Sequence, residues 1–183
     1  MQLNPAKIPE NKEVKEYLSW RATCVTEAQT KNLVNKLADA ICVKSNFVTY
    51  VGMSQKPQKV EDGKAYFTPD TKVVYFTLTD KEGHEYLPLF TDEAELLKWQ
   101  QATEKKPFKM LMTFDDLGPV FVTNTKFSGV VINPMSDNFI MPRGLIASWM
   151  TRKRAVLDAA IREVMKKKAA AKDSAVDTQS GND

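Results

Sequence analysis

Few residues of this chain have the types that nucleophilic or acid–base catalysis uses. His84 is the only histidine, so a Ser-His-Asp or Cys-His device would have to include it. It lies between Glu82 and Glu85 in a turn sequence, where we expect it to be in solvent. Cys24 adjoins a helix start, and Cys42 falls on an apolar helix face, where burial makes a thiol unreactive. We therefore expect no catalytic residue among them.

Three pairs of carboxylates could supply a general acid and a general base: Glu61 with Asp62, Glu93 with Glu95, and Asp115 with Asp116. Each pair also has a simpler interpretation, since the first suits a solvated loop and the others suit the positive end of a helix dipole. Glycine-rich phosphate loops, calcium loops and nucleophile elbows leave local signatures, and the sequence contains none of them. One His and two Cys without Cys-x-x-Cys spacing do not make a zinc motif. The sequence predicts no enzyme, no cofactor and no metal site.

The positive charge is concentrated near the C-terminus. Residues 1–149 hold 18 basic and 18 acidic residues, whereas 150–172 hold eight basic and two acidic ones. Binding of nucleic acid is one interpretation, because each Lys or Arg on a phosphate releases counterions. Contact with a protein partner, an anionic membrane surface, or plain solubility are the others. No aromatic residue follows Trp149, although a platform for stacking single strands would use several.

The overall composition is that of an ordinary globular domain. A chain of 183 residues is long enough for one domain with extensions. No apolar run approaches the roughly 18 to 20 residues that a membrane span needs. The first residues lack the basic start and apolar stretch of a secretory signal. With only two cysteines, a disulfide framework is not expected, and we predict a cytoplasmic location.

Hydrophobic periodicity predicts an alternation of helices and strands. Helices are expected at 11–23, from Thr26 to about 42 behind a capping box with Gln29, at 92–101, briefly after 115, and from Pro142 onward. Strands are expected at 47–53, 72–79, 84–90, 108–114, 128–133 and 139–141, with a loop at 54–63 and an antiparallel hairpin of 72–79 with 84–90. The order predicts an α+β fold with a mixed, mainly antiparallel sheet flanked by helices, and a long C-terminal helix.

These elements suggest four parts of the chain: a helical extension at 1–25, an α+β domain at 26–150, a basic helical extension at 151–172, and a disordered acidic tail at 173–183. In the basic extension, apolar residues continue the stripe of the last domain helix: Leu157, Ile161, Val164 and Met165. We expect them to pack on the domain or on a second copy of the chain, which would make a homo-oligomer.

Two short motifs resemble a known family. Leu87-Pro88-Leu89-Phe90-Thr91-Asp92 and Val130-Val131-Ile132-Asn133-Pro134 are similar to the signatures of the SseB-type N-terminal domain, a strand-to-helix junction and a strand ending. The resemblance extends from about Asn32 to Met150 and includes the helix that carries Trp99. It implies the fold of that domain, and it implies no enzymatic activity.

Both motifs lie at strand ends, so they could specify turns or line a site. If they line a site, we expect Thr91, Asn133 and Arg143 to converge, with Phe90 as an apolar wall. The leading hypothesis is a non-enzymatic cytoplasmic accessory or regulatory module that binds a protein or peptide. The alternatives are an enzyme of unrecognised class acting on a small molecule through scattered Asp, Arg and Asn residues, and a nucleic-acid-binding protein that uses the basic helix.

Overall fold

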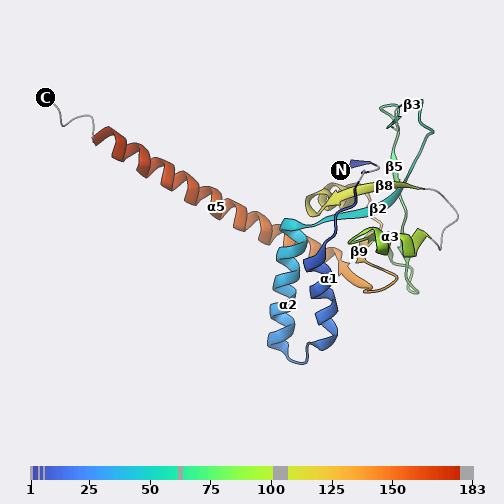
Figure 1. Cartoon of the computed structure of the whole chain (residues 1–183), viewed down its shortest axis with the longest axis horizontal. Coiled ribbons are helices and arrows are strands. Elements are labelled where there is room, and N and C mark those ends of the chain that lie inside the picture. The colour runs from blue at the N-terminus through green and yellow to red at the C-terminus, as the bar shows by residue number, and fades with distance from the viewer. Residues whose placement is uncertain (1, 4, 6, 62–63, 101–106, 178–183) are drawn as a thin grey trace.

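The structure is a computed structural model, and it describes the whole chain except residues 1, 4, 6, 62–63, 101–106 and 178–183. Its body combines two four-stranded sheets with a helical hairpin, and a long helix leaves the body toward the C-terminus (Figure 1). A two-stranded hairpin of β3 (Lys59–Glu61) and β4 (Lys64–Tyr66) forms a separate small sheet. The predicted α+β class, with mainly antiparallel sheets flanked by helices, is confirmed.

The first sheet is antiparallel throughout. Its strands stand in the order β1 (Gln2–Leu3), β8 (Phe108–Thr113), β2 (Asn46–Met53) and β5 (Val73–Tyr75). β2 and β8 are central, which is why their sequences are nearly continuous apolar runs.

The second sheet is mixed, in the order β10 (Phe139–Pro142), β9 (Phe127–Ile132), β7 (Glu85–Leu89) and β6 (Leu78–Thr79). β7 and β9 run parallel, and the other two pairs are antiparallel. Val48 and Phe90 exchange backbone hydrogen bonds of 3.1 and 2.8 Å, which join the two sheets. The carboxyl ends of β7 and β9 therefore meet at one edge, beside the point where the sheets touch.

Helices cover these sheets. They are α1 (Lys12–Trp20), α2 (Glu27–Asp39), α3 (Glu93–Gln100), α4 (Leu117–Thr123) and α5 (Arg143–Asp177). α2 begins with the predicted capping box, in which Gln29 N–H donates to Thr26 Oγ1 at 3.2 Å and Thr26 N–H donates to Gln29 Oε1 at 3.0 Å. The first helix packs on the body, because Val14 and Leu18 are buried in the main core.

One predicted strand is divided between the two sheets. Segment 72–79 breaks into β5, which pairs with β2, and β6, which pairs with β7 over only two residues. Val73 and Val74 are 39% and 51% exposed, since β5 is an edge strand. The expected loop at 54–63 contains β3. Alternation along a strand indicates its pleat and does not identify the strand it pairs with.

The C-terminal helix is the long one that was predicted, but its outer part does not pack on the body. Ile146 and Trp149 are buried, whereas every side chain from Arg154 to Lys168 is exposed. The expected packing of Leu157, Ile161, Val164 and Met165 on the domain is therefore wrong; packing on a second copy stays a prediction. The helix continues to Asp177, into the predicted tail, and residues 178–183 lie outside the described part. Among the described helices, none is long and apolar enough to cross a membrane.

Candidate functional site

The two sequence motifs meet because they end neighbouring parallel strands. Leu89 of β7 is in register with Ile132 of β9, and Asn133 N–H donates to the Leu89 carbonyl at 2.9 Å. The residues after these strands, Thr91 and Asn133, consequently lie side by side although 42 positions separate them. In open sheets with parallel strands, ligand sites form beyond the carboxyl ends of the strands, so this edge is the first place to look for a site.

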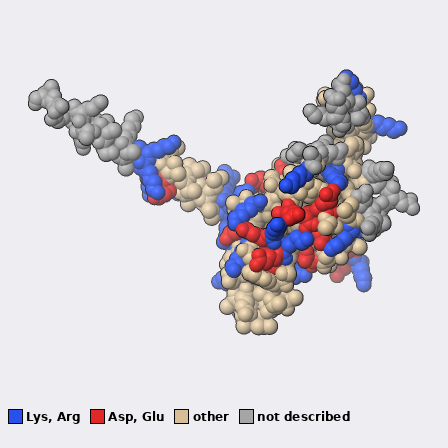
Figure 2. All heavy atoms as spheres, viewed as in Figure 1, with Lys and Arg blue, Asp and Glu red and all other residues tan. Residues whose placement is uncertain are grey.

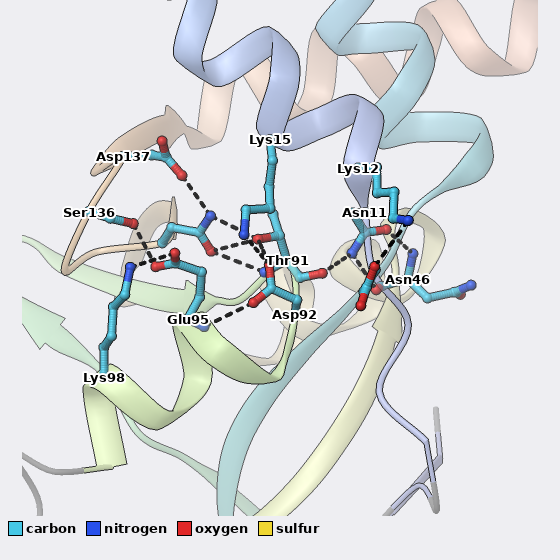
Figure 3. A network of polar contacts seen from close by, with 12 residues as sticks. Asn11, Lys12, Lys15, Asn46, Thr91, Asp92, Glu95, Lys98, Ser136 and Asp137 are labelled. Carbon is cyan, nitrogen blue, oxygen red and sulfur yellow. Dashed lines mark hydrogen bonds and ion pairs between the residues drawn. The ribbon is translucent and has the colours of Figure 1, made fainter.

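Asn133 is buried and is the centre of a polar network, which we call the Asn133 cluster. Figure 3 labels its partners Thr91 and Asp137. Asn133 Oδ1 accepts from Thr91 N–H at 3.0 Å, and its Nδ2 donates to Thr91 Oγ1 at 2.9 Å and to Asp137 Oδ2 at 2.7 Å. Its φ is 48°, a left-handed conformation that Asn tolerates better than most residues. Its carbonyl accepts from Ser136 N–H and Asn138 N–H, which closes the turn into β10.

The cluster also fixes the start of α1 against both sheets. Asn11 Nδ2 donates to the Thr91 carbonyl at 2.7 Å and to the Asn46 carbonyl at 2.9 Å. One turn into α1, Lys15 Nζ lies 2.8 Å from Asp92 Oδ2. Figure 3 shows these side chains pointing from α1 toward the β7–α3 junction. Four separate segments of the chain therefore meet at this point.

Asp92 is held in its ionised form at the beginning of α3. Its Oδ1 accepts from Glu95 N–H at 3.0 Å, as a helix N-cap does. Burial by itself raises the pKa of the Asp92 carboxyl, but the hydrogen bonds from Lys15 and Glu95 N–H and the charge of Lys15 hold that pKa below its ordinary value. The same contact with Asp92 raises the pKa of Lys15. A carboxylate of lowered pKa is a weak general base at neutral pH.

Both carboxylate oxygens of Glu95 also have partners. Its Oε2 accepts from Ser136 Oγ at 2.6 Å, and its Oε1 lies 2.7 Å from Lys98 Nζ. Among the described residues, no buried side-chain nitrogen or oxygen lacks a hydrogen-bond partner. Each buried polar atom of the cluster therefore has at least one partner within the protein. Such a network fixes backbone positions and leaves no buried side-chain donor or acceptor without a partner among the described residues.

The four predicted site residues do not converge as expected. Thr91 and Asn133 are in contact, but Phe90 is fully buried and packs with Tyr50 and Trp99 in a core cluster. Arg143 does not lie beside Thr91 and Asn133. Its guanidinium donates to the carbonyls of Thr125 and Phe121 and lies over the Phe121 ring. These contacts are at the opposite end of β9, about 17 Å along the strand from Asn133. A binding role for the four residues stays a prediction.

A wide shallow groove of about 720 Å³ adjoins the cluster, between the N-terminal segment, α1 and the start of α3. Three of its four lysines face acidic neighbours: Lys12 Nζ lies 3.5 Å from Glu10, Lys15 Nζ 2.8 Å from Asp92, and Lys109 Nζ 2.9 Å from Glu93. In Figure 2 red and blue atoms accordingly alternate over this face of the body. Four lysines and three carboxylates line the groove, so most of the positive charge is compensated within it.

The remaining candidates for chemistry are also accounted for by local structure. His84 is exposed, and its Nδ1 lies 3.1 Å from Asp80 Oδ2. Potential metal-ligand atoms of Asp80, Glu82 and His84 lie within 4.8 Å of one another. The three residues are spaced two positions apart in the sequence. Asp80 Oδ1 already accepts from the N–H groups of Glu82 and His84, as in an Asx turn. Burial raises the pKa of the Cys42 thiol to about 11, which keeps it protonated at neutral pH.

A second candidate surface is apolar and lies along α5. Where α5 leaves the body, a groove of about 240 Å³ opens between it and the end of α2 with the π turn 40–44; we call it the root groove. Beyond it, residues 154–168 form what we call the arm. Leu157, Ile161 and Val164, the apolar stripe of the arm, are 56%, 49% and 53% exposed. In Figure 2 a tan surface leads outward along the arm to a group of blue atoms with a few red ones beside them.

Sequence reasoning missed most of the side chains that surround Thr91 and Asn133. The helix expected at 92–101 is present as α3, but nothing local indicates that Asn11, 80 positions from Thr91, binds the Thr91 carbonyl. The only signal was the combination of a polar residue before a helix with a motif at a strand end. Pairings across such a separation depend on the fold rather than on spacing.

Comparison with known protein families gives one match. The model of the SseB protein N-terminal domain matches residues 20–148. The match contains β7, α3, β9 and β10, and it begins ahead of Asn32, where the resemblance was expected to start. No curated protein and no solved structure matches the chain.

Proposed function

The chain belongs to the family of the SseB protein N-terminal domain, and we propose that it is a non-enzymatic accessory or regulatory module that binds another protein in the cytoplasm. The observation that carries this proposal is the apolar stripe of the arm, with Leu157, Ile161 and Val164 about half exposed. Burial of each in a complex would contribute up to about 1.5 to 3 kcal/mol. Exposed apolar surface of this kind marks interaction sites.

The geometry of the polar groups supports a role without chemistry. The Asn133 cluster satisfies its own donors and acceptors, and Asp92 is held ionised by Lys15. The Cys42 thiol is protonated at neutral pH, and His84 is bound to the turn that contains Asp80. The cytoplasmic location is supported by two free cysteines, Cys24 and Cys42, since oxidising compartments favour disulfides.

The proposal is tested by capture and then by direct binding. The full-length chain is immobilised, proteins from an extract of the source cell are cross-linked to it, and each captured protein is purified. We expect at least one to bind the purified chain with micromolar affinity or better. The absence of any such partner contradicts the proposal. A small-molecule and hydrolase screen examines the enzyme alternative, which would be established by a turnover that Asp92→Asn abolishes.

Nucleic acid is the second candidate, because the arm carries basic residues without acidic partners in the described structure, Arg162 and Lys166 to Lys168. Fluorescently labelled single-stranded and duplex oligonucleotides would distinguish it. If they bind through this surface, the logarithm of the binding constant falls linearly with the logarithm of the salt concentration. We expect no binding at physiological salt.

A further inference from the structure

We propose that the root groove and the apolar stripe of the arm together bind a helical protein segment that has one apolar face bordered by acidic side chains. This rests on the proposed function and specifies the chemistry of the partner. Helix-in-groove recognition uses anchors spaced three and four residues apart.

The root groove offers the concave part of the surface. It lies between α5 and the end of α2, and seven of its lining residues are apolar: Ala38, Cys42, Val43, Trp149, Val156, Leu157 and Ala160. Val43 is 71% exposed and forms part of the open rim of the groove, whereas Trp149 is only 5% exposed and forms part of its base. A narrow apolar cleft of this shape accepts a side chain or a helix edge, whereas a flat membrane surface covers only its rim.

The groove and the arm form one continuous surface, because Leu157 belongs to both. Ile161 follows Leu157 by four residues, Val164 follows by three more, and Lys168 by four more, so all four lie on one face of α5. From Leu157 to Lys168 the helix rises about 16 Å, or three turns. The occupant that matches this length is another helix of three to four turns.

Charge determines which helix fits. Near the body, basic side chains have partners: Arg152 lies 3.5 Å from Asp39, and Lys153 lies 2.6 Å from Asp115. Farther out, Arg154, Lys167 and Lys168 border the stripe, and within the described structure they form no ion pair. Acidic residues beside the apolar face of a partner would neutralise them.

The other occupants fit less well. A second copy would bring one basic arm against another, and like charges in contact are destabilising. Nucleic acid would neutralise the lysines but would leave Leu157, Ile161 and Val164 facing water or phosphate. The acidic amphipathic helix satisfies both features at once.

The experiment uses three synthetic peptides of about three heptads each and the full-length chain. The first peptide has Leu at the a and d positions and Glu at the flanking e and g positions. The second replaces the Glu residues by Lys, and the third replaces the Leu residues by Ser. Binding is measured by fluorescence anisotropy. We expect the first peptide to bind, and the other two to bind at least about tenfold more weakly.

Two pairs of variants test the surface with matched controls. L157S with I161S removes the stripe, and its control, V25S with V122S, removes two apolar side chains that are 85% and 76% exposed elsewhere. K167E with K168E reverses charge beside the stripe, and its control, R162E with K166E, makes the same change on the opposite helix face. We expect each test variant to weaken peptide binding about tenfold or more, and each control to change it less than about twofold.

Equal binding of the acidic and basic peptides, or equal loss in test and control variants, would overturn the inference. So would a dimer at micromolar concentration that L157S with I161S dissociates, since a second copy would then be the occupant. Displacement of the acidic peptide by oligonucleotides or by anionic vesicles, without sensitivity to L157S with I161S, would identify a purely electrostatic surface. If a captured protein binds the stripe variant as well as it binds the parent chain, the proposed function stands and this inference fails. If the peptide binds through the stripe but no cellular partner is found, this inference stands and the proposed function fails.

Discussion

The Asn133 cluster and the arm place opposite kinds of side chain in opposite surroundings. In the cluster, polar groups are buried, as with Thr91 and Asn133 at 0% exposure, and within the described residues each buried polar atom has a partner. In the arm, apolar groups are exposed, and the basic groups beside them make no ion pair with the described part of the chain. The polar atoms that looked like a binding site are therefore used by the fold itself.

The difference shows where free energy is still available for binding. A buried hydrogen-bond network contributes to stability because losing one partner leaves the other unsatisfied, at about 1 to 3 kcal/mol. An exposed apolar side chain contributes little to the isolated chain, and its burial is still available to a partner. Substitutions in the cluster should accordingly change stability, and substitutions in the arm should change binding.

The largest effect is expected where α5 is still part of the body. Trp149 is 5% exposed and belongs to the main core, so Trp149→Ala should lower the free energy of unfolding by about 3 to 5 kcal/mol. Val156, two turns farther along the same helix, is 64% exposed, and Val156→Ala should change it by less than about 0.5 kcal/mol. Urea unfolding followed by circular dichroism measures both. Similar losses in the two variants would show that the arm packs on the body.

The next largest effect is expected at Asn133. Asn133→Ala removes every side-chain bond to Thr91 and Asp137 and places Ala at a φ of 48°, so unfolding should become easier by about 3 kcal/mol. Asn138→Ala is the matched control, because Asn138 has a φ of 44° but an exposed side chain. It should cost only about 1 kcal/mol. If the two variants lose the same amount in urea unfolding, the cluster adds nothing beyond its turn.

Local signals were enough to predict most elements of the fold. The capping box at Thr26 and Gln29 and the apolar runs of β2, β8 and β9 have the positions that their patterns predict. The division of segment 72–79 between two sheets was not predictable. The pattern of Val73 to Thr79 reports which side chains alternate, while the choice of neighbouring strand depends on residues far away in the sequence.

Prediction of the candidate site succeeded for the pair that a parallel ladder joins and failed elsewhere. Thr91 and Asn133 follow strands that became neighbours, so their contact is a consequence of strand pairing. Arg143 follows β10, an antiparallel strand, and the chain has by then returned to the other end of β9. The direction of that last strand alone separates Arg143 from the cluster.

A smaller effect, with a defined pH dependence, is expected at Asp92. The pKa of Asp92 is lowered in the folded state, so its contribution to stability is present above the ordinary value of 3.8 and disappears as the pH falls through the lower folded pKa. Asp92→Asn should cost about 1 kcal/mol at neutral pH, because its partner Lys15 is partly exposed. The difference between parent and variant should vanish well below pH 3.8. Urea midpoints across this range measure it.

Glu13→Gln is the control for Asp92→Asn. It removes an exposed ion pair between Glu13 and Lys44, 3.0 Å apart, and Glu13 lies in α1, the helix that also contains Lys15. An exposed pair contributes about 0 to 1 kcal/mol, so this variant should unfold like the parent at neutral pH. A difference between Asp92→Asn and the parent chain that stays constant down to the acid limit would show that the lowered pKa does not contribute to stability.

The smallest effect on stability is expected in the arm, where the sequence alone suggested a large one. Leu157 and Ile161 are 56% and 49% exposed, and of the two only Leu157 lines the root groove, so L157S with I161S should change the free energy of unfolding by less than about 1 kcal/mol. Serine has a lower helix propensity, which costs a few tenths of a kcal/mol per residue, or about 0.5 kcal/mol for the two substitutions. We therefore expect the free energy of unfolding to fall by about 0.5 kcal/mol. Urea unfolding at two protein concentrations, tenfold apart, would measure it. A concentration-independent loss of about 3 kcal/mol or more would mean that the stripe packs within one chain, and a concentration-dependent loss would mean that it packs between two. If neither loss is observed, the stripe contributes nothing to the folding of this chain. Its apolar area can then contribute free energy only by being buried against a different binding partner.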